Sequence, residues 1–475
     1  MTSASEPSRR APSARVEGAA AASPAPPLPA PSARADVVVV GGGLAGLTAA
    51  VTLARRGVDV ALLEARERVG GRVLTLRAPF ADGLFAEAGP EFISAGHDAL
   101  RGWLAGYGLA VRPRRAGPRL LCLDGRVGRG WSPAVFGGRA PADLRRLAEA
   151  TAEVREHVPT PYEAWRAPDA AALDGRSFGA WLDALALGPL VRTYMHVWPT
   201  LDYGVEPEGL SLLTYARDER LLEPFAAGES GHAPGGLDHL TGAMAVEMGA
   251  RVYLRTAATT LAQTADAVRV GYARDGMGGE VEARYAVVAV PGTVLRTLAV
   301  TPPWPPARQR AVAGLRYGHV LKVHLQFRRR FWHDRGRSRG AMTDQPLQSV
   351  WDSTWHQPGP RGILTIYTAG RYAVALAALP EAERLERCLD YLARLYPGCK
   401  AEFERGTAMD WDADPASRGA YSHFAPGELT AFAPWLARPE GRLHFAGEHT
   451  DPWQATMNGA VASGQRAAAE VLARL

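Results

Sequence analysis

Cysteine is scarce in this 475-residue chain, and the few cysteines present do not form a recognisable site. They are Cys122, Cys388 and Cys399, and no two of them have the short spacing of metal ligands or of a redox pair. This pattern argues against a disulfide framework and against a zinc site. It fits a reducing compartment, and together with the missing export signal described below it leads us to expect a cytoplasmic protein.

The chain also lacks the features of a nucleic-acid-binding or membrane-anchored protein. Its net charge of +5 is small for its length, and no compact basic stripe carries interleaved aromatic residues. Residues 37–54 are uncharged and long enough to register in a hydropathy window. Three consecutive glycines within them favour a strand, a turn and a helix instead. We therefore predict no nucleic-acid partner and no membrane partner.

Residues 1–35 lack the apolar side chains that a folded segment buries. They are mostly alanine, proline, serine and arginine, which predicts a disordered tail. Arg9 and Arg10 resemble the start of a twin-arginine export signal. The prolines between Pro24 and Pro31 occupy the place of the apolar segment that such a signal needs.

A glycine-rich turn follows the tail, between an apolar strand and a helix. In the turn, Gly41-x-Gly43-x-x-Gly46 supplies the tight bend, the close backbone approach to a pyrophosphate and the close contact of helix and strand. The helix directs its N-terminal N–H groups and the positive end of its dipole at the phosphates. Glu64 ends the next strand, where its carboxylate can accept both ribose hydroxyls. Together these features predict a dinucleotide site.

The length of the chain predicts two domains, because single cores stop growing at about 250–300 residues. Short apolar strands between helices predict an α/β fold with a doubly wound, Rossmann-like domain. Its further elements are a helix at 238–248, strands at 251–256 and 267–272 joined by a loop, and strands at 285–290 and 443–447. We assign 36–97, 231–299 and 436–475 to this dinucleotide-binding domain, and 98–230 and 300–435 to an inserted α+β substrate-binding domain.

Two patterns give the chain a family resemblance that covers about residues 36–475. Gly70-Gly71-Arg72 follows the sequence LLEARERV, and FAGEHT near the C-terminus is followed by MNGA and by a Ser-Gly pair. Together they resemble the flavin-containing amine oxidases, which include monoamine, polyamine and L-amino-acid oxidases. These motifs are shared with desaturases and protoporphyrinogen oxidases of the same fold. Other residues must therefore separate the classes.

Lys322 is the first of these residues. In the predicted strand Val320–Phe327, it shares one face with His324 and Gln326 while the apolar residues share the other. Amine oxidases carry a lysine in such a strand, followed shortly by Phe-Trp, here Phe331-Trp332, and the family's lysine reaches a water on flavin N5. The resemblance thus implies a catalytic Lys322. The alternative is a strand with one solvated polar face.

Tyr421 is the second. The segment Asp410–Gly427 resembles the family's Trp–…–Gly-x-Tyr segment, so Trp411 is implied near the flavin and Tyr421 as one wall of an aromatic cage. Some relatives attach the flavin to a cysteine just before this tyrosine. Here that residue is Ala420, which implies non-covalent FAD. The alternative for each of these aromatic residues is an ordinary place in the core.

Thr456 departs from the monoamine-oxidase pattern, in which the second cage wall is aromatic. A small hydroxyl residue occurs there in the polyamine-oxidase and histone-demethylase branches, so Thr456 is still implied at the catalytic site. Trp453, three residues upstream, is a candidate replacement for the missing wall.

The resemblance also implies a set of cofactor contacts. Glu64 holds the adenosine ribose, Arg72 lies near the pyrophosphate, and Met457 directs its N–H toward flavin O2 at the positive end of the last helix. His449 is interpreted as structural. The full implied FAD set is Gly41, Gly43, Ala45, Gly46, Glu64, Arg72, Ala88, Gly89, Pro90, Ala258, Trp411, Gly447, Glu448 and Met457.

The implied reaction is FAD-dependent oxidation of a small-molecule amine to an imine, with O2 reduced to H2O2. The rival activity is L-amino-acid oxidation, which needs an arginine for the substrate carboxylate; Arg217, Arg220 and Arg371 are candidates. Glu91 would favour cationic amines if it faces the cavity, and it is equally compatible with a surface or helix-capping acid. Two further alternatives are a desaturase or oxidase of an apolar substrate and a non-catalytic flavin-binding module.

Overall fold

The fold was analysed in a computed structural model of the chain. It describes residues 30–114, 119–130, 132–137, 139–225, 230–334 and 338–475. Most of the predicted disordered tail, residues 1–29, lies outside the described residues. The first strand begins at Arg34, two residues before the predicted start of the folded domain at residue 36.

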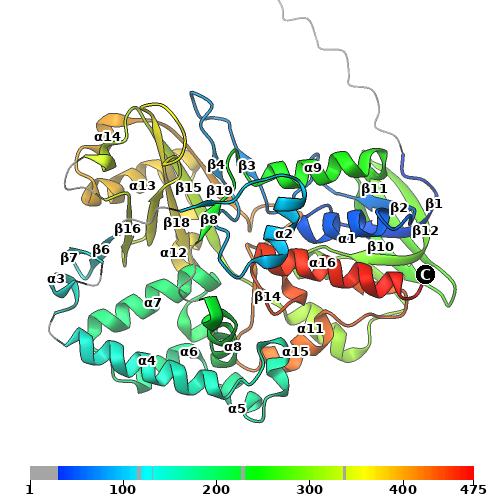
Figure 1. The fold of residues 1–475 in the computed structure, drawn as a ribbon, viewed down its shortest axis with the longest axis horizontal. Helices are drawn as coiled ribbons and strands as arrows, with labels where there is room; N and C mark the ends of the chain where they lie inside the picture. Colours follow the sequence, from blue (N-terminus) through cyan, green and yellow to red (C-terminus); the bar gives the residue numbers. More distant parts are fainter. Residues whose placement is uncertain (1–29, 115–118, 131, 138, 226–229, 335–337) are drawn as a thin grey trace, which may run out of the picture.

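An eight-stranded sheet forms one half of the molecule, on the right in Figure 1. Its parallel part has the order β9-β2-β1-β12-β21, formed by Val252–Tyr253, Val60–Leu63, Arg34–Val40, Met277–Val288 and Leu443–Phe445. The apolar runs VVVV and VALL are buried on both faces, as parallel strands require. Helices α1 (Leu44–Ala54), α2 (Asp98–Gly106), α9 (Asp238–Met248) and α16 (Met457–Leu472) share one buried core with this sheet.

The sheet is extended on its other side by an antiparallel layer. Strands β10 (Ala257–Gln263) and β11 (Val268–Arg274) pair with β12, and β13 (Ala299–Thr301) pairs with β10. The predicted loop after residue 256 is therefore wrong, because most of it is strand β10. The predicted strand 251–256 shrinks to β9, since Arg255 adopts a φ of 56° and turns the chain. Helix α9 has the predicted bounds.

A seven-stranded sheet forms the other half, in the order β19-β15-β18-β17-β16-β6-β7. Its central strand β15 has the predicted bounds Val320–Phe327. The other strands are Phe403–Asp410, Gly362–Ala369, Ser349–Asp352, Gly340–Thr343, Leu120–Leu123 and Arg126–Arg129. Helices α12 (Gly370–Ala377), α13 (Glu381–Leu395) and α14 (Cys399–Glu402) lie beside it at the upper left of Figure 1.

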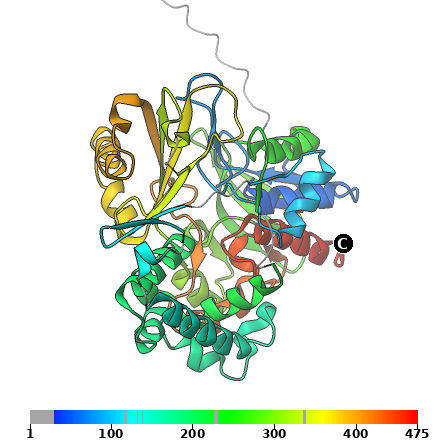
Figure 2. The same ribbon diagram turned by 60° about the vertical axis from the view of Figure 1, so that its left-hand side comes forward.

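A layer of helices completes the molecule at the lower left of Figure 1 and comes forward in Figure 2. It contains α4 (Ala140–Glu156), α5 (Ala170–Asp174), α6 (Phe178–Ala184), α7 (Pro189–Tyr203) and α8 (Leu212–Leu222). Helices α11 (Pro306–Gly314) and α15 (Glu428–Leu436) pack on each other next to it. The remaining α-helices and strands are short: α3 (Pro133–Phe136), α10 (Gly292–Leu295), β3 (Thr75–Leu76), β4 (Ala86–Glu87), β5 (Arg112–Pro113), β8 (Gly231–His232), β14 (Arg316–Tyr317) and β20 (Ser422–His423).

Helix α2 packs with a different half of the molecule from the one to which the predicted domain division assigned it. Residues from 98 onward were assigned to the substrate domain, but Leu100, Trp103 and Leu104 are buried in the core shared with α1 and α16. The apolar face of α2 therefore belongs with the eight-stranded sheet; the rest of the domain division stays a prediction. Within the residues that the structure describes, we find no helix with the length and hydropathy needed to cross a bilayer.

Candidate active site

A large cavity of about 730 Å³ extends from the turn between β1 and α1 to strands β15 and β18. Of the implied FAD set and the implied catalytic residues, every one except Gly46 lines it, including Lys322, Tyr421, Thr456 and Ala258. The sequence patterns at the two ends of the chain therefore meet at one cavity. The roles given to these residues stay predictions.

Gly46 acts from behind the cavity wall. A Cβ at this position would lie 1.8 Å from the carbonyl oxygen of Gly41, so only glycine allows helix α1 to approach the turn so closely. Gly41 itself has a φ of 104°, which favours glycine. Close packing of helix and strand brings the unpaired N–H groups of the first helical turn to the cavity.

Glu64 fixes the shape of this turn. Its buried carboxylate accepts hydrogen bonds from Gly42 N at 2.7 Å and from Arg66 N at 2.8 Å, one on each oxygen. Each carboxylate oxygen can accept more than one bond. Glu64 can thus organise the glycine turn and still accept a sugar hydroxyl from the cavity.

Arg72 and Glu448 form an ion pair in the middle of the cavity wall, with Nη1 and Oε1 3.0 Å apart. Glu448 also accepts bonds from Ser422 N, Ser422 Oγ and Ala455 N. Burial alone would raise the pKa of the Glu448 carboxyl, but Arg72 and these donors hold that pKa below its usual range. The pair therefore stays charged and ties the last segment of the chain to the Gly70–Arg72 turn.

The segment Ala88–Pro90 is held by two side chains from the other half of the molecule. Trp411 Nε1 donates to the Ala88 carbonyl at 3.1 Å, and Lys322 Nζ donates to the Gly89 carbonyl at 2.7 Å. A Cβ at Gly89 would lie 1.8 Å from Arg72 O, so this segment also packs tightly against the cofactor side. Trp411 therefore has a specific contact at the cavity and is not simply core.

Lys322 is buried, and so is every residue of β15. The solvated polar face considered for this strand is therefore wrong. Lys322 Nζ also donates to Glu87 O at 3.0 Å and lies over the rings of Trp351 and Tyr367, 5.3 and 5.9 Å from their centroids. Burial lowers the pKa of the Lys322 ammonium, and Glu91 and Glu87 oppose this shift.

Glu91 lies on the cavity wall beside Lys322. Its Oε2 is 3.8 Å from Lys322 Nζ and accepts a hydrogen bond from Trp351 Nε1 at 2.9 Å. The interpretation of Glu91 as a surface or capping acid is therefore wrong, and its charge faces the cavity. Burial raises the pKa of the Glu91 carboxyl, while Lys322 and Trp351 lower it.

Tyr421 forms part of an aromatic wall with Tyr367. Their hydroxyl oxygens are 2.7 Å apart, and both hydroxyls donate to the carbonyl of Leu201, at 2.9 Å from Tyr421 and 3.1 Å from Tyr367. Burial raises the pKa of the Tyr421 phenol well above its usual value. The two phenols are thus neutral and fixed in position at the cavity.

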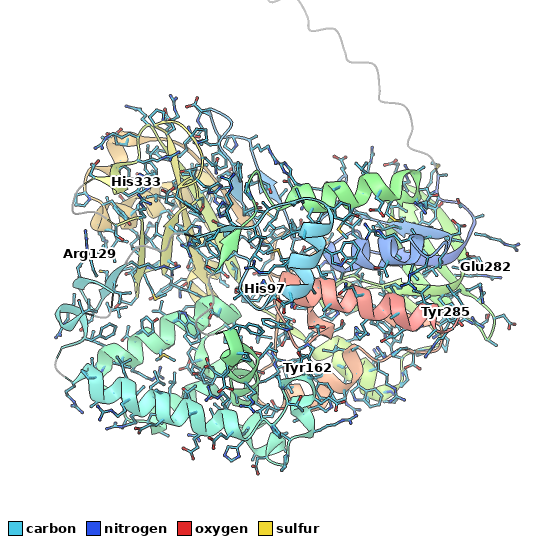
Figure 3. The ribbon with its side chains drawn as sticks, in the orientation of Figure 1. His97, Arg129, Tyr162, Glu282, Tyr285 and His333 are labelled. Atoms are coloured by element: carbon cyan, nitrogen blue, oxygen red, sulfur yellow. The ribbon has the colours of Figure 1, made fainter. Side chains whose placement is uncertain are left out.

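Thr456 lines the cavity and caps helix α16. Its Oγ1 accepts from Gly459 N at 3.0 Å and donates to Trp453 O at 2.7 Å. Trp453 does not line the cavity; it packs against His97 and Phe225, so the suggestion that it replaces the missing wall is wrong. Figure 3 shows His97 near the middle of the molecule.

Several cavity residues were not identified from the sequence. Tyr367 and Trp351 lie on β18 and β17, next to β15 in the sheet, and Phe92, Arg119, Trp198 and Asp202 complete the substrate side. The three candidate arginines do not line the cavity, since Arg217 binds Asp218, Arg220 binds Glu223 and Arg371 lies over Tyr372. For the missed cavity residues, the sequence offered one signal: Trp198 and Asp202 are four residues apart, which places them on the same face of a helix.

The residues present fit an FAD molecule. The cavity begins at glycines that bring helix N–H groups to its surface, continues past buried Glu64 and Arg72, and ends at an aromatic wall. Tight backbone contacts at Gly41, Gly46 and Gly89 keep side chains out of this space. Ala420 stands where a covalent attachment would need a cysteine.

Comparison with known proteins gives one consistent result. The family model described as flavin containing amine oxidoreductase matches residues 44–472. The putative flavin-containing monoamine oxidase AofH of Mycobacterium tuberculosis is 32% identical over 461 residues, which cover 93% of this chain and 97% of that protein.

Two solved structures share the fold. Cyclohexylamine oxidase from Brevibacterium oxydans is 25% identical with a TM-score of 0.84, covering 93% of this chain and 99% of that one. Putrescine oxidase, solved with bound putrescine, is 27% identical with a TM-score of 0.83 and the same two coverages.

Proposed function

Because this chain belongs to the flavin-containing amine oxidoreductase family, we propose that it oxidises an amine to an imine and reduces O2 to H2O2. It is an oxidoreductase acting on amines, and its cofactor is non-covalent FAD. What we propose beyond the family is the specific substrate, the imine product and the formation of H2O2.

The observation that carries the proposal is the position of Lys322. Its ammonium donates to two main-chain carbonyls, Glu87 O and Gly89 O, which fix its position. It lines the same cavity as the residues expected to bind FAD. A fixed cation in a water-poor site stabilises negative charge that develops nearby more strongly than one in bulk water. Lys322 therefore suits the stage at which O2 takes up electrons.

The aromatic wall supports the other half of the reaction. Bound FAD supplies the acceptor for two electrons and a hydrogen from the substrate carbon. The substrate nitrogen must be uncharged at that point, and an apolar wall of Tyr367, Tyr421 and Trp351 disfavours an ammonium by desolvation. The wall also orients the substrate and excludes water, and no separate general base is required. The imine then takes up water and gives an aldehyde or ketone.

The rival L-amino-acid oxidase activity has a supporting observation within the cavity. Arg119 lines the substrate side of the cavity, where a guanidinium could pair with a carboxylate. Asp202 on the same wall opposes a carboxylate. We therefore place amine oxidation first and keep amino-acid oxidation as the second candidate.

Anaerobic mixing of the FAD-loaded protein with amines, polyamines and L-amino acids tests the proposal. Bleaching of the oxidised flavin band by amines supports it, and bleaching by L-amino acids alone supports the rival. If no compound of either class bleaches a fully loaded protein, amine oxidation is wrong, and the apolar-substrate or non-catalytic alternatives follow. Cytoplasmic residence stays a prediction.

A further inference from the structure

Asp202 is a carboxylate on the cavity wall that the proposed reaction does not use. It lies in the last turn of helix α7, and its exposed side-chain surface faces the cavity. Within the part of the chain that the structure describes, its carboxylate accepts no hydrogen bond and has no cation within 4 Å. The Asp202 side chain is exposed, lines the cavity and pairs with no described protein group, so its carboxylate is available to a cationic ligand in the cavity.

The position of Asp202 is unfavourable for an anion. The C-terminal turn of a helix carries the negative end of its dipole, where a carboxylate is destabilising. Burial raises the pKa of Asp202 to about 7, an effect that Arg119 opposes and that Asp218 and Glu219 reinforce. A carboxylate placed against these local preferences is typical of a functional position.

The surroundings of Asp202 suit a cation. Trp198 lies four residues earlier, on the same face of α7, and also lines the cavity. An aromatic face next to a carboxylate is a common arrangement for binding an ammonium group. The adjacent Leu201 carbonyl receives the hydroxyls of Tyr367 and Tyr421, so the end of α7 is fixed against the wall where the substrate amine is expected.

We propose that Asp202 binds a second cationic nitrogen of the substrate, so that the enzyme prefers α,ω-diamines to monoamines of the same length. This inference rests on the proposed amine oxidation. The nitrogen that reacts lies at the tyrosine wall, and the distant ammonium lies between Asp202 and the ring of Trp198. Arg119 forms no ion pair with Asp202, which leaves the carboxylate available.

The test compares n-alkylamines with α,ω-diamines of four to eight carbons as substrates of the wild type and of Asp202→Asn. The amide keeps the shape of the side chain and removes its charge. For the preferred chain length we expect kcat/KM for the diamine to exceed that for the monoamine at least tenfold. In Asp202→Asn the diamine should lose at least tenfold, mainly through KM, and the monoamine less than threefold. Asp183→Asn, an exposed acid that binds Arg192 on α7 from outside, is the matched control.

The pH profile gives an independent readout. In the wild type, kcat/KM for the diamine should gain an ionisation near pH 7, rising as Asp202 loses its proton, and Asp202→Asn should lose it. The monoamine profile should show no such step in either protein. The other titratable groups near Asp202 are Arg119, Asp218, Glu219, Tyr194, Tyr203, Tyr367 and Tyr421.

Each outcome decides the question. Equal rates with diamines and monoamines, or an equal loss of both in Asp202→Asn, overturn the role of Asp202 and leave amine oxidation intact. Oxidation of L-amino acids that is abolished by Arg119→Met overturns it in favour of the rival. Failure of every amine to bleach the flavin overturns the proposed function as well.

Discussion

The two ends of the cavity are built in different ways. The cofactor end relies on the main chain: glycine turns, helix N–H groups and two carboxylates that bind backbone donors, Glu64 and Glu448. The substrate end relies on side chains from several strands and helices, among them Trp198, Trp351 and Tyr367. The first end depends on positions where little besides glycine fits. The second depends on which side chains the fold brings together.

The largest expected effect tests the cofactor end. Gly46→Ala puts a Cβ 1.8 Å from Gly41 O, and the backbone must shift to accommodate it. We expect a cost at or above the about 1–3 kcal/mol typical of overpacking, with loss of bound FAD. Flavin content after purification and thermal unfolding measure it. Gly102→Ala in α2, where a Cβ meets nothing, should retain FAD; normal FAD content in Gly46→Ala would contradict the packing argument.

Lys322→Met tests the junction of the two ends. FAD should remain bound, while reoxidation of the flavin by O2 or overall turnover falls by about 10²-fold, as when a preorganised charge stabiliser is removed. Stopped-flow absorbance separates reduction from reoxidation. The chain contains one other lysine, Lys400, which is half-exposed and paired with Asp390, so Lys400→Met is a direct control. Unchanged kinetics in Lys322→Met would remove this residue from the mechanism.

Acidic pH should lower the stability of the fold at the cofactor end, because His449 becomes protonated there. Burial lowers the pKa of His449 to about 4, below its ordinary value of 6.5, so the folded state holds it neutral. Its contribution to stability is complete above pH 6.5 and is lost as pH falls toward 4, at about 1.4 kcal/mol per pH unit. Thermal unfolding between pH 4 and 7 should show a shallower pH dependence in His449→Gln than in the wild type. An equal slope in both proteins would argue against a role of His449 in the acid sensitivity. His157 is half-exposed, so His157→Gln provides the control.

The smallest expected effect concerns Thr456, which belongs to both ends. Thr456→Val removes the acceptor for Gly459 N and should cost about 1 kcal/mol, whereas Thr456→Ser keeps the cap. Thermal unfolding of the two variants measures the difference. If the serine variant is destabilised as much as the valine variant, the methyl group and its packing matter more than the cap.

The contrast between the two ends explains what the sequence could predict. Main-chain sites need glycines and acids at fixed spacings, so the turn at Gly41 and the acid Glu64 were visible, as were the strand of Lys322 and helix α9. Asp202, Arg119 and Tyr367 come from separate elements, and their meeting depends on long-range packing that no local spacing records. The prediction for Trp453 failed for the same reason. Its spacing from Thr456 was compatible with a place on the cavity wall, but the ring packs against His97 and Phe225 instead. Strand β10 was missed because the turn at Arg255 has no proline or glycine to mark it.

The division of the cofactor site between the two ends of the chain also sets when FAD can be bound during protein synthesis. The ribosome produces the glycine turn and Glu64 first, whereas Glu448 and helix α16, which packs against α1, are among the last parts made. At about 5–20 residues per second, roughly 20 to 80 seconds separate Glu64 from Glu448. During this interval α1 can pack against α9 but lacks α16, and the predicted cofactor site is incomplete. The residues that we expect to hold FAD are therefore all present only after the last part of the chain has been made.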